Sequence, residues 1–231
     1  MQLETRIKKL TTILNKYEVE DLNQKYKEAE LNMVISNFTK YPEVRYSENM
    51  KKRMINEAKR KKISKSKMDY IQFLIDKNNH FDYKKYQTEI YSQVSQFFDD
   101  LEKKEFKDFH TKGIFLEHDF DPKIIYCQIY SNSNFSVSDT EVKRFKTNFD
   151  LSEVWGFLEN HRFDSFVEAL EIIDLEDEEY PQIFIELFKL HSYKLLKKSF
   201  QTKKIKDRIG LKNLKIVVGE HDNWSYEIYN E

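Results

Sequence analysis

The sequence predicts an α+β protein in which a helical N-terminal region, residues 1–80, precedes an α+β domain, residues 81–231. Two observations predict this class. Apolar residues in the first 80 positions recur at intervals of three and four, which is the period of an amphipathic helix. After residue 110, short runs of β-branched and aromatic residues are bounded by turn residues, which is typical of hairpins. We therefore expect a small, mostly antiparallel sheet of two hairpins packed against helices.

Four helices are expected in the N-terminal region. The apolar stripes predict the first two over residues 3–17 and 22–33, and we expect these two to pack as an antiparallel pair. Ser47 is a candidate N-cap for a third helix that continues to Lys62. A fourth helix is expected to begin at Ser64 or Ser66, and it ends at a break over residues 78–80.

The C-terminal region alternates between helical and extended patterns. A long helix is expected over residues 83–109, and a short one after the capping-box pattern of residues 138–141. The acidic run at residues 174–179 precedes Pro181 and suits the start of another long helix. The strands are expected to form two hairpins, the first over residues 114–130 and the second over residues 214–229.

Composition narrows the possible classes of protein. The chain has 231 residues, a net charge of −1, 4 Gly and 3 Pro, which excludes collagen-like and low-complexity proteins. The N-terminus lacks the apolar segment of a secretory signal, and no run approaches the ~18 apolar residues that cross a bilayer. The single Cys127 cannot form an internal disulfide and is interpreted as a small buried hydrophobe. We expect a cytoplasmic protein without a transmembrane segment.

Two identical tripeptides are the only repeated group of residues that could bind a metal ion or transfer protons. They are Glu117-His118-Asp119 and Glu220-His221-Asp222, and each follows a short apolar run. Carboxylates with a histidine can hold a divalent cation, so a metal-dependent hydrolase built on Glu117-Asp119 and Glu220-Asp222 is one hypothesis. The alternative is that polar residues only mark where two strands end and turns begin.

Charge is distributed unevenly along the chain. Residues 1–80 carry a net charge of +7 and residues 81–231 carry −8. The basic residues concentrate at positions 51–67, where a helix could bind phosphates, a partner protein or a membrane surface, or could simply be solvated. The candidate nucleic-acid-binding residues are Lys51, Lys52, Arg53, Lys59, Arg60, Lys61 and Lys62.

The acidic run is a candidate docking surface for a basic partner, because complementary charge steers association. Its five carboxylates are Asp174, Glu176, Asp177, Glu178 and Glu179. Nucleotide-binding, zinc-binding and nucleophile-elbow motifs do not occur in the sequence. No cofactor is expected, and the lack of catalytic signatures favours a non-enzymatic protein.

The order of elements also carries a resemblance to a known class. Residues 113–117 with 124–127, followed by residues 214–219, give the order helix, two strands, helices, long helix and strand. Over residues 83–231 this resembles the small α+β immunity proteins that bacteria carry against polymorphic toxins. The resemblance implies a protein without enzymatic activity that binds and neutralises a toxin domain. The principal hypothesis is therefore a protein-binding module, with nucleic-acid binding and metal-dependent hydrolysis as alternatives.

Overall fold

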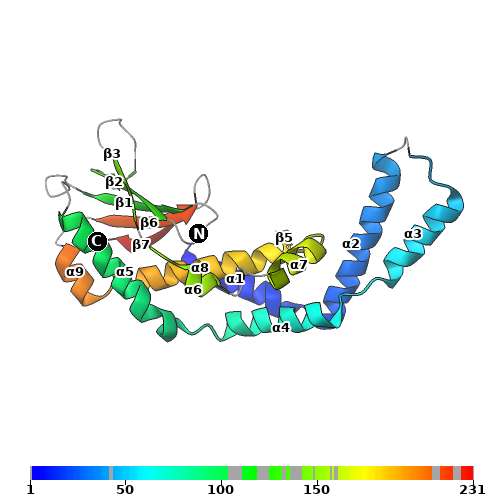
Figure 1. Ribbon diagram of the computed structural model, residues 1–231, viewed down its shortest axis with the longest axis horizontal. Helices are drawn as coiled ribbons and strands as arrows, with labels where there is room; N and C mark the ends of the chain where they lie inside the picture. The colour runs from blue at the N-terminus through cyan, green and yellow to red at the C-terminus, as the bar shows by residue number, and fades with distance from the viewer. Residues whose placement is uncertain are drawn as a thin grey trace. The chain divides into compact units, whose positions relative to one another are not determined.

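The computed structural model describes residues 2–41, 44–103, 111–118, 125–131, 134–135, 142–147, 149–156, 158, 161–209, 214–220 and 225–230. Contacts within the chain define two compact units (Figure 1). The first contains Met1–Lys8, Phe81–Phe157 and Phe188–Glu231, and the second contains Lys9–His80 and Leu158–Leu187. The predicted α+β class is confirmed. Within the described part of the chain, no helix is long and apolar enough to cross a bilayer.

The first unit contains a five-stranded mixed sheet with the order β3-β2-β1-β6-β7. The predicted hairpins are β1–β2 and β6–β7, and β2 also pairs antiparallel with β3. The two hairpins meet where β1 runs parallel to β6. The strands are β1 (Gly113–His118), β2 (Ile125–Tyr130), β3 (Val142–Lys146), β6 (Lys215–Glu220) and β7 (Ser225–Asn230).

Helices cover this sheet through a largely aromatic core. The C-terminal part of α8 (Tyr180–Phe200) lies on the sheet, where the ring of Tyr193 stands 5.8 Å from that of Tyr226. Phe200 contacts Phe97 and Phe98 of α5 (Tyr83–Lys103). The shorter helices of this unit are α6 (Ser152–Trp155) and α9 (Lys203–Ile209). The long apolar stripes of the sequence therefore become the buried faces of α5 and α8.

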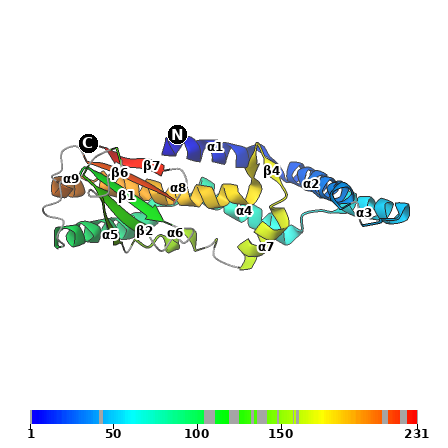
Figure 2. The same ribbon diagram turned by 90° about the horizontal axis from the view of Figure 1, so that it is seen from above.

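The second unit is mostly helical. Its α2 and α3 lie side by side as an antiparallel pair (Figures 1 and 2). Ser47 caps α3, as predicted, by accepting a hydrogen bond from the Met50 N–H. Of the two residues expected to begin α4, Ser64 is its N-cap and accepts a hydrogen bond from the Lys67 N–H. The helices are α2 (Val19–Lys40), α3 (Glu48–Arg60), α4 (Lys65–Asn79) and α7 (His161–Leu170), with α1 (Leu3–Lys16) from Lys9 onwards and the first part of α8.

An aromatic cluster holds α4, α7 and the start of α8 together. Phe166 of α7 stands 5.9 Å from Tyr70 of α4 and 5.6 Å from Phe184 of α8 in edge-to-face contacts. Tyr180 packs 5.5 Å from Phe184. Such ring pairs contribute roughly 0.5–1.5 kcal/mol each beyond the apolar area they bury.

Three sequence-based expectations were wrong. The helix that packs against α2 is α3, and not the first helix of the chain. Strand β3 occupies the place of the short helix expected after residues 138–141, which themselves lie outside the described residues. The acidic run forms a two-stranded hairpin of β4 (Asp174–Leu175) and β5 (Glu178–Glu179), and α8 begins only at Tyr180. Each error concerns pairing between segments, on which local sequence patterns carry little information.

Candidate functional site

The parallel pairing of β1 with β6 brings the described residues of the two Glu-His-Asp tripeptides, Glu117, His118 and Glu220, to the same edge of the sheet. His118 lies opposite Glu220, and Glu117 lies opposite Gly219. The chain then leaves β1 towards one side of the sheet and β6 towards the other. In open sheets the crevice outside such carboxyl ends is a common ligand-binding position. The remaining tripeptide residues, Asp119, His221 and Asp222, lie outside the described residues.

The described polar side chains at this edge bind one another. The ring Nε2 of His118, a buried residue, is hydrogen-bonded to the hydroxyl of Tyr193. The Lys189 ammonium lies 3.0 Å from the Glu220 carboxylate. The Gln128 amide donates to the Glu117 carboxylate at 2.6 Å. The first two contacts join α8 to the sheet, the third lies within the sheet between β2 and β1, and each described charge has a partner among them.

The described residues at this edge of the sheet include no set of ligands for a metal ion. Among the described residues, no three His, Cys, Asp or Glu side chains are placed to hold one ion. The Glu220 carboxylate faces a lysine, which supplies the positive charge that a metal ion would supply. The hypothesis of a metal-dependent hydrolase stays a prediction for the full tripeptides. The described part supports a structural role for Glu117, His118 and Glu220.

Two other reactive side chains of the first unit are buried. Burial raises the pKa of the Cys127 thiol well above its usual value, so Cys127 is not a thiolate nucleophile. Burial, and then the nearby Lys194 ammonium, lower the pKa of His191 to about 3, so its ring is neutral at pH 7. The Tyr83 hydroxyl lies 2.7 Å from Nδ1 of that ring.

The basic residues at positions 51–62 divide into two groups. Three form ion pairs: Lys51 with Glu48 at 2.9 Å, Arg53 with Glu57 at 2.8 Å, and Lys61 with the buried Glu30 at 2.7 Å. The others are solvent-exposed and form no ion pair with the described residues. They are Lys52, Lys59, Arg60 and Lys62.

Two carboxylates of the acidic run form ion pairs within the second unit. Glu178 pairs with Lys9 at 3.2 Å, and Glu176 pairs with Lys16. Both lysines belong to α1, so the β4–β5 hairpin binds that helix. Asp174, Asp177 and Glu179 remain exposed. The surface that the run offers to a partner is therefore smaller than the sequence indicates.

Large exposed apolar side chains gather at one end of the α2–α3 pair. Tyr41 is 43% exposed, Val44 46% and Met50 50%. We call these three residues the apolar tip, because they flank the connection between the two helices. Tyr41 and Val44 were not singled out from the sequence, because local periodicity does not show which apolar residues a helix pair leaves exposed. The one available signal was their place beside Pro42, in a connection too short to have its own core.

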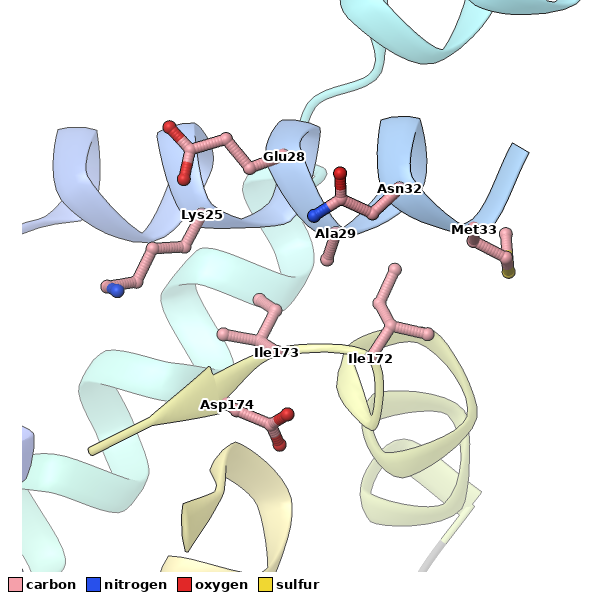
Figure 3. Close-up of a pocket in the computed structure, with 8 residues that line it drawn as sticks. All are labelled: Lys25, Glu28, Ala29, Asn32, Met33, Ile172, Ile173 and Asp174. Carbon is pink, nitrogen blue, oxygen red and sulfur yellow. The ribbon is translucent and has the colours of Figure 1, made fainter. Parts of the chain in front are cut away.

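Two hollows lie in the second unit. Ile172 and Ile173 point towards α2 and form one wall of an open pocket of about 420 Å³, opposite Ala29 and Met33 (Figure 3). A larger groove of about 710 Å³ lies between the start of α2 and α4, with Val19 and Met68 among its apolar residues. Carboxylates but no basic side chains line this groove, whereas the pocket beside Ile172 and Ile173 is lined by both acidic and basic side chains.

Comparisons with known proteins give no relative for this chain: no protein-family model, no curated protein and no solved structure matches it.

Proposed function

We propose that this chain is a protein-binding module that contacts its partner through the apolar tip of the α2–α3 pair. The observation that carries the proposal is the exposure of Tyr41, Val44 and Met50 together at one end of that pair. Clustered exposed apolar side chains are a common mark of interaction surfaces. Aromatic and methionine side chains are also enriched where partners meet.

The α2–α3 pair is held together by contacts other than those of the tip. Lys61 reaches the buried Glu30, and the side chain of Asn23 accepts a hydrogen bond from the Ile63 N–H at 2.9 Å. The ring of Phe38 lies 5.1 Å from that of Tyr46. Because these contacts hold the two helices together, the side chains of the tip are not needed to stabilise the pair. Leaving the tip exposed costs roughly 25 cal/mol for each Å² of apolar surface in water. Binding of a partner that covers the tip would recover this free energy.

Charge around the tip indicates the chemistry of the partner. Lys40, Arg45 and Lys52 are exposed beside it. The same stretch of the sequence has two carboxylates, Glu43 and Glu48, and Glu48 is paired with Lys51, so residues 40–52 carry a net charge of +2. A partner with an apolar pocket and an acidic rim would match both features. The rim charges would raise the association rate and fix the orientation of the partner, and the apolar contacts would supply affinity.

The finer proposal is that the partner is a toxin domain which this chain neutralises. Its support is the order of elements in residues 83–231, where two hairpins and intervening helices resemble immunity proteins. The proposal implies that the partner is produced in the same cell. It also implies that binding alone, without catalysis by this chain, abolishes the activity of the partner.

Affinity capture with surface variants tests the module. The triple variant Tyr41→Ser, Val44→Ser, Met50→Ser removes the tip, and Tyr126→Thr removes an exposed apolar side chain from a strand of the other unit as a matched control. We expect the wild type and the control to capture the same protein from the source cells, and the triple variant to lose it. Equal capture by all three would rule out the tip as the contact surface.

Growth experiments test the finer proposal. The captured protein should arrest growth when it is expressed alone, and co-expression of this chain should restore growth. Rescue should fail with the tip variant and succeed with Tyr126→Thr. A captured protein that is harmless when expressed alone would contradict toxin neutralisation while leaving the binding module intact.

Nucleic-acid binding is the second candidate function. The observation in its favour is the group of four exposed basic residues on and after α3 that form no ion pair with the described part of the chain. Phosphate contacts would make binding fall steeply with salt. The variant Lys59→Gln, Arg60→Gln should then weaken a gel shift with RNA or DNA, whereas Lys203→Gln, Lys204→Gln should not. Absence of any salt-sensitive shift with the wild type would dispose of this candidate.

A further inference from the structure

The groove between α2 and α4 combines an apolar floor with an acidic rim. Leu14, Leu22 and Ile71 form part of its floor and are buried, while Val19 stands 45% exposed at its side. No lysine, arginine or histidine is among the residues that line it. Its carboxylates are Glu18, Glu20, Asp69 and Asp76.

Two basic residues contact Tyr17, which lines the groove. Lys16 and Lys25 stack on the ring of Tyr17 at 5.5 and 5.1 Å. The Lys16 ammonium also pairs with Glu176. Because the lining itself holds four carboxylates and no basic side chain, a ligand of the groove should offer apolar side chains surrounded by positive charge.

The apolar tip has that chemistry. Tyr41, Val44 and Met50 are exposed, and residues 40–52 hold four basic residues against the two carboxylates of Glu43 and Glu48, a net charge of +2. The tip cannot reach the groove of its own chain. The groove begins at the N-terminus of α2 and the tip follows its C-terminus, and a helix of 22 residues is about 33 Å long. A second copy of the chain is needed to bring them together.

We propose that the apolar tip of one copy docks into the α2–α4 groove of another, so that the chain associates with itself. The inference rests on the tip that the proposed function assigns, and it adds the groove as the matching surface. The contact joins two different surfaces, so it either closes into a ring or continues into a chain of copies. Self-docking covers the tip until a partner with a better-fitting acidic pocket displaces it.

Sedimentation of the purified full-length chain tests self-docking. We expect concentration-dependent association of the wild type that weakens at least about tenfold when salt rises from roughly 0.05 M to roughly 0.5 M, because exposed charges are then screened. The tip variant Tyr41→Ser, Val44→Ser, Met50→Ser should be monomeric. So should the groove variant Asp69→Lys, Asp76→Lys, in which two rim charges are reversed.

Mixing the two variants gives the sharpest result. The tip variant keeps its groove and the groove variant keeps its tip, so an equimolar mixture should form a one-to-one complex and nothing larger. Glu168→Lys, Glu171→Lys makes the same charge change at exposed positions in and after α7 and should associate like the wild type. A wild type that stays monomeric at about 0.1 mM in low salt, where exposed charges attract most strongly, would overturn the proposal. So would mixed variants that remain monomers.

The outcomes separate this inference from the proposed function. The groove variant should still capture the partner of the tip, because its tip is intact. Partner capture without self-association would overturn self-docking alone. Self-association of a chain that captures no protein through its tip would overturn the proposed function alone.

Discussion

His191 shows how burial sets the protonation of a single side chain. Its ring stacks on Phe81 at 4.3 Å between centroids and is hydrogen-bonded to the Tyr83 hydroxyl. Burial lowers its pKa to about 3, below the ~6.5 of an unfolded histidine. As pH falls below about 6.5, His191 therefore binds a proton in the unfolded state but not in the folded state. The free energy of unfolding should fall by about 2 kcal/mol between pH 7 and pH 5 on this account.

The variant His191→Gln isolates this pH dependence. Its unfolding free energy, measured in urea, should lack the loss of about 2 kcal/mol that the wild type shows on acidification. The exposed His161 provides the control, and His161→Gln should keep the pH dependence of the wild type. If the unfolding free energy of His191→Gln depended on pH as that of the wild type does, the His191 ring would be taking up a proton in the folded protein as well.

The Lys189–Glu220 ion pair tests whether the carboxyl edge of β1 and β6 is structural. Both side chains are largely buried, with 10% and 13% exposed. Removing one partner takes a direct ion-pair contact away from a largely buried charge, so Glu220→Gln should destabilise the protein by about 3 kcal/mol, whereas Lys189→Met with Glu220→Leu should recover most of that loss. The exposed pair Arg53–Glu57 is the comparison, where Glu57→Gln should leave the unfolding free energy close to that of the wild type. Loss of a bound metal ion from Glu220→Gln would instead restore the metal-binding hypothesis.

Two buried tyrosines should respond oppositely to removal of the hydroxyl. The Tyr180 hydroxyl is buried and has no hydrogen-bond partner among the described residues, whereas that of Tyr193 bonds His118. An unsatisfied buried hydroxyl costs roughly 1–3 kcal/mol. Tyr180→Phe should therefore raise the unfolding free energy by about 1 kcal/mol, and Tyr193→Phe should lower it by a similar amount. Destabilisation by Tyr180→Phe would mean that its hydroxyl does have a partner.

Elements with strong local signals were predicted well from the sequence. Ser47 and Ser64 fix the starts of α3 and α4 because their side chains accept hydrogen bonds from backbone N–H groups one turn later. The apolar runs of the two hairpins fixed β1, β2, β6 and β7. Strand β3 was missed, because its sequence at residues 142–146 alternates with charged residues and it is held only by pairing with β2. The parallel pairing of β1 with β6 joins residues about a hundred positions apart, which no local pattern encodes.

The turn between β4 and β5 was missed for a different reason. Glu176 and Asp177 have φ angles of 53° and 67°, a left-handed conformation in which glycine and asparagine are usual. Nothing in a run of acidic residues predicts it. Asp177→Gly should relieve the conformation and raise the unfolding free energy by about 0.5–1 kcal/mol. Asp164→Gly, inside α7, should lower it by about 1 kcal/mol, because a glycine weakens a helix. Destabilisation by Asp177→Gly would show that the side chain matters more than the backbone strain.

At the scale of the whole molecule, the candidate surfaces follow from what each segment leaves unburied. Residues 51–62 are strongly basic in sequence, yet three of their basic side chains form ion pairs with Glu48, Glu57 and Glu30. The acidic run was predicted to face a partner, yet two of its carboxylates bind α1. Exposure is set by the packing of distant segments, which is why the sequence located the charged surfaces only in part and the apolar tip not at all.

Photo-cross-linking inside cells identifies the contact surface of a protein-binding module directly. A photo-cross-linking amino acid placed at Val44 lies in the apolar tip, and one placed at Glu168 lies at an exposed position on α7 as the control. We expect irradiation of cells that naturally make this chain to trap a second, different protein from position 44 and not from position 168. The same trapping efficiency from both positions, or adducts to copies of this chain alone, would contradict the proposal that the tip binds a partner protein.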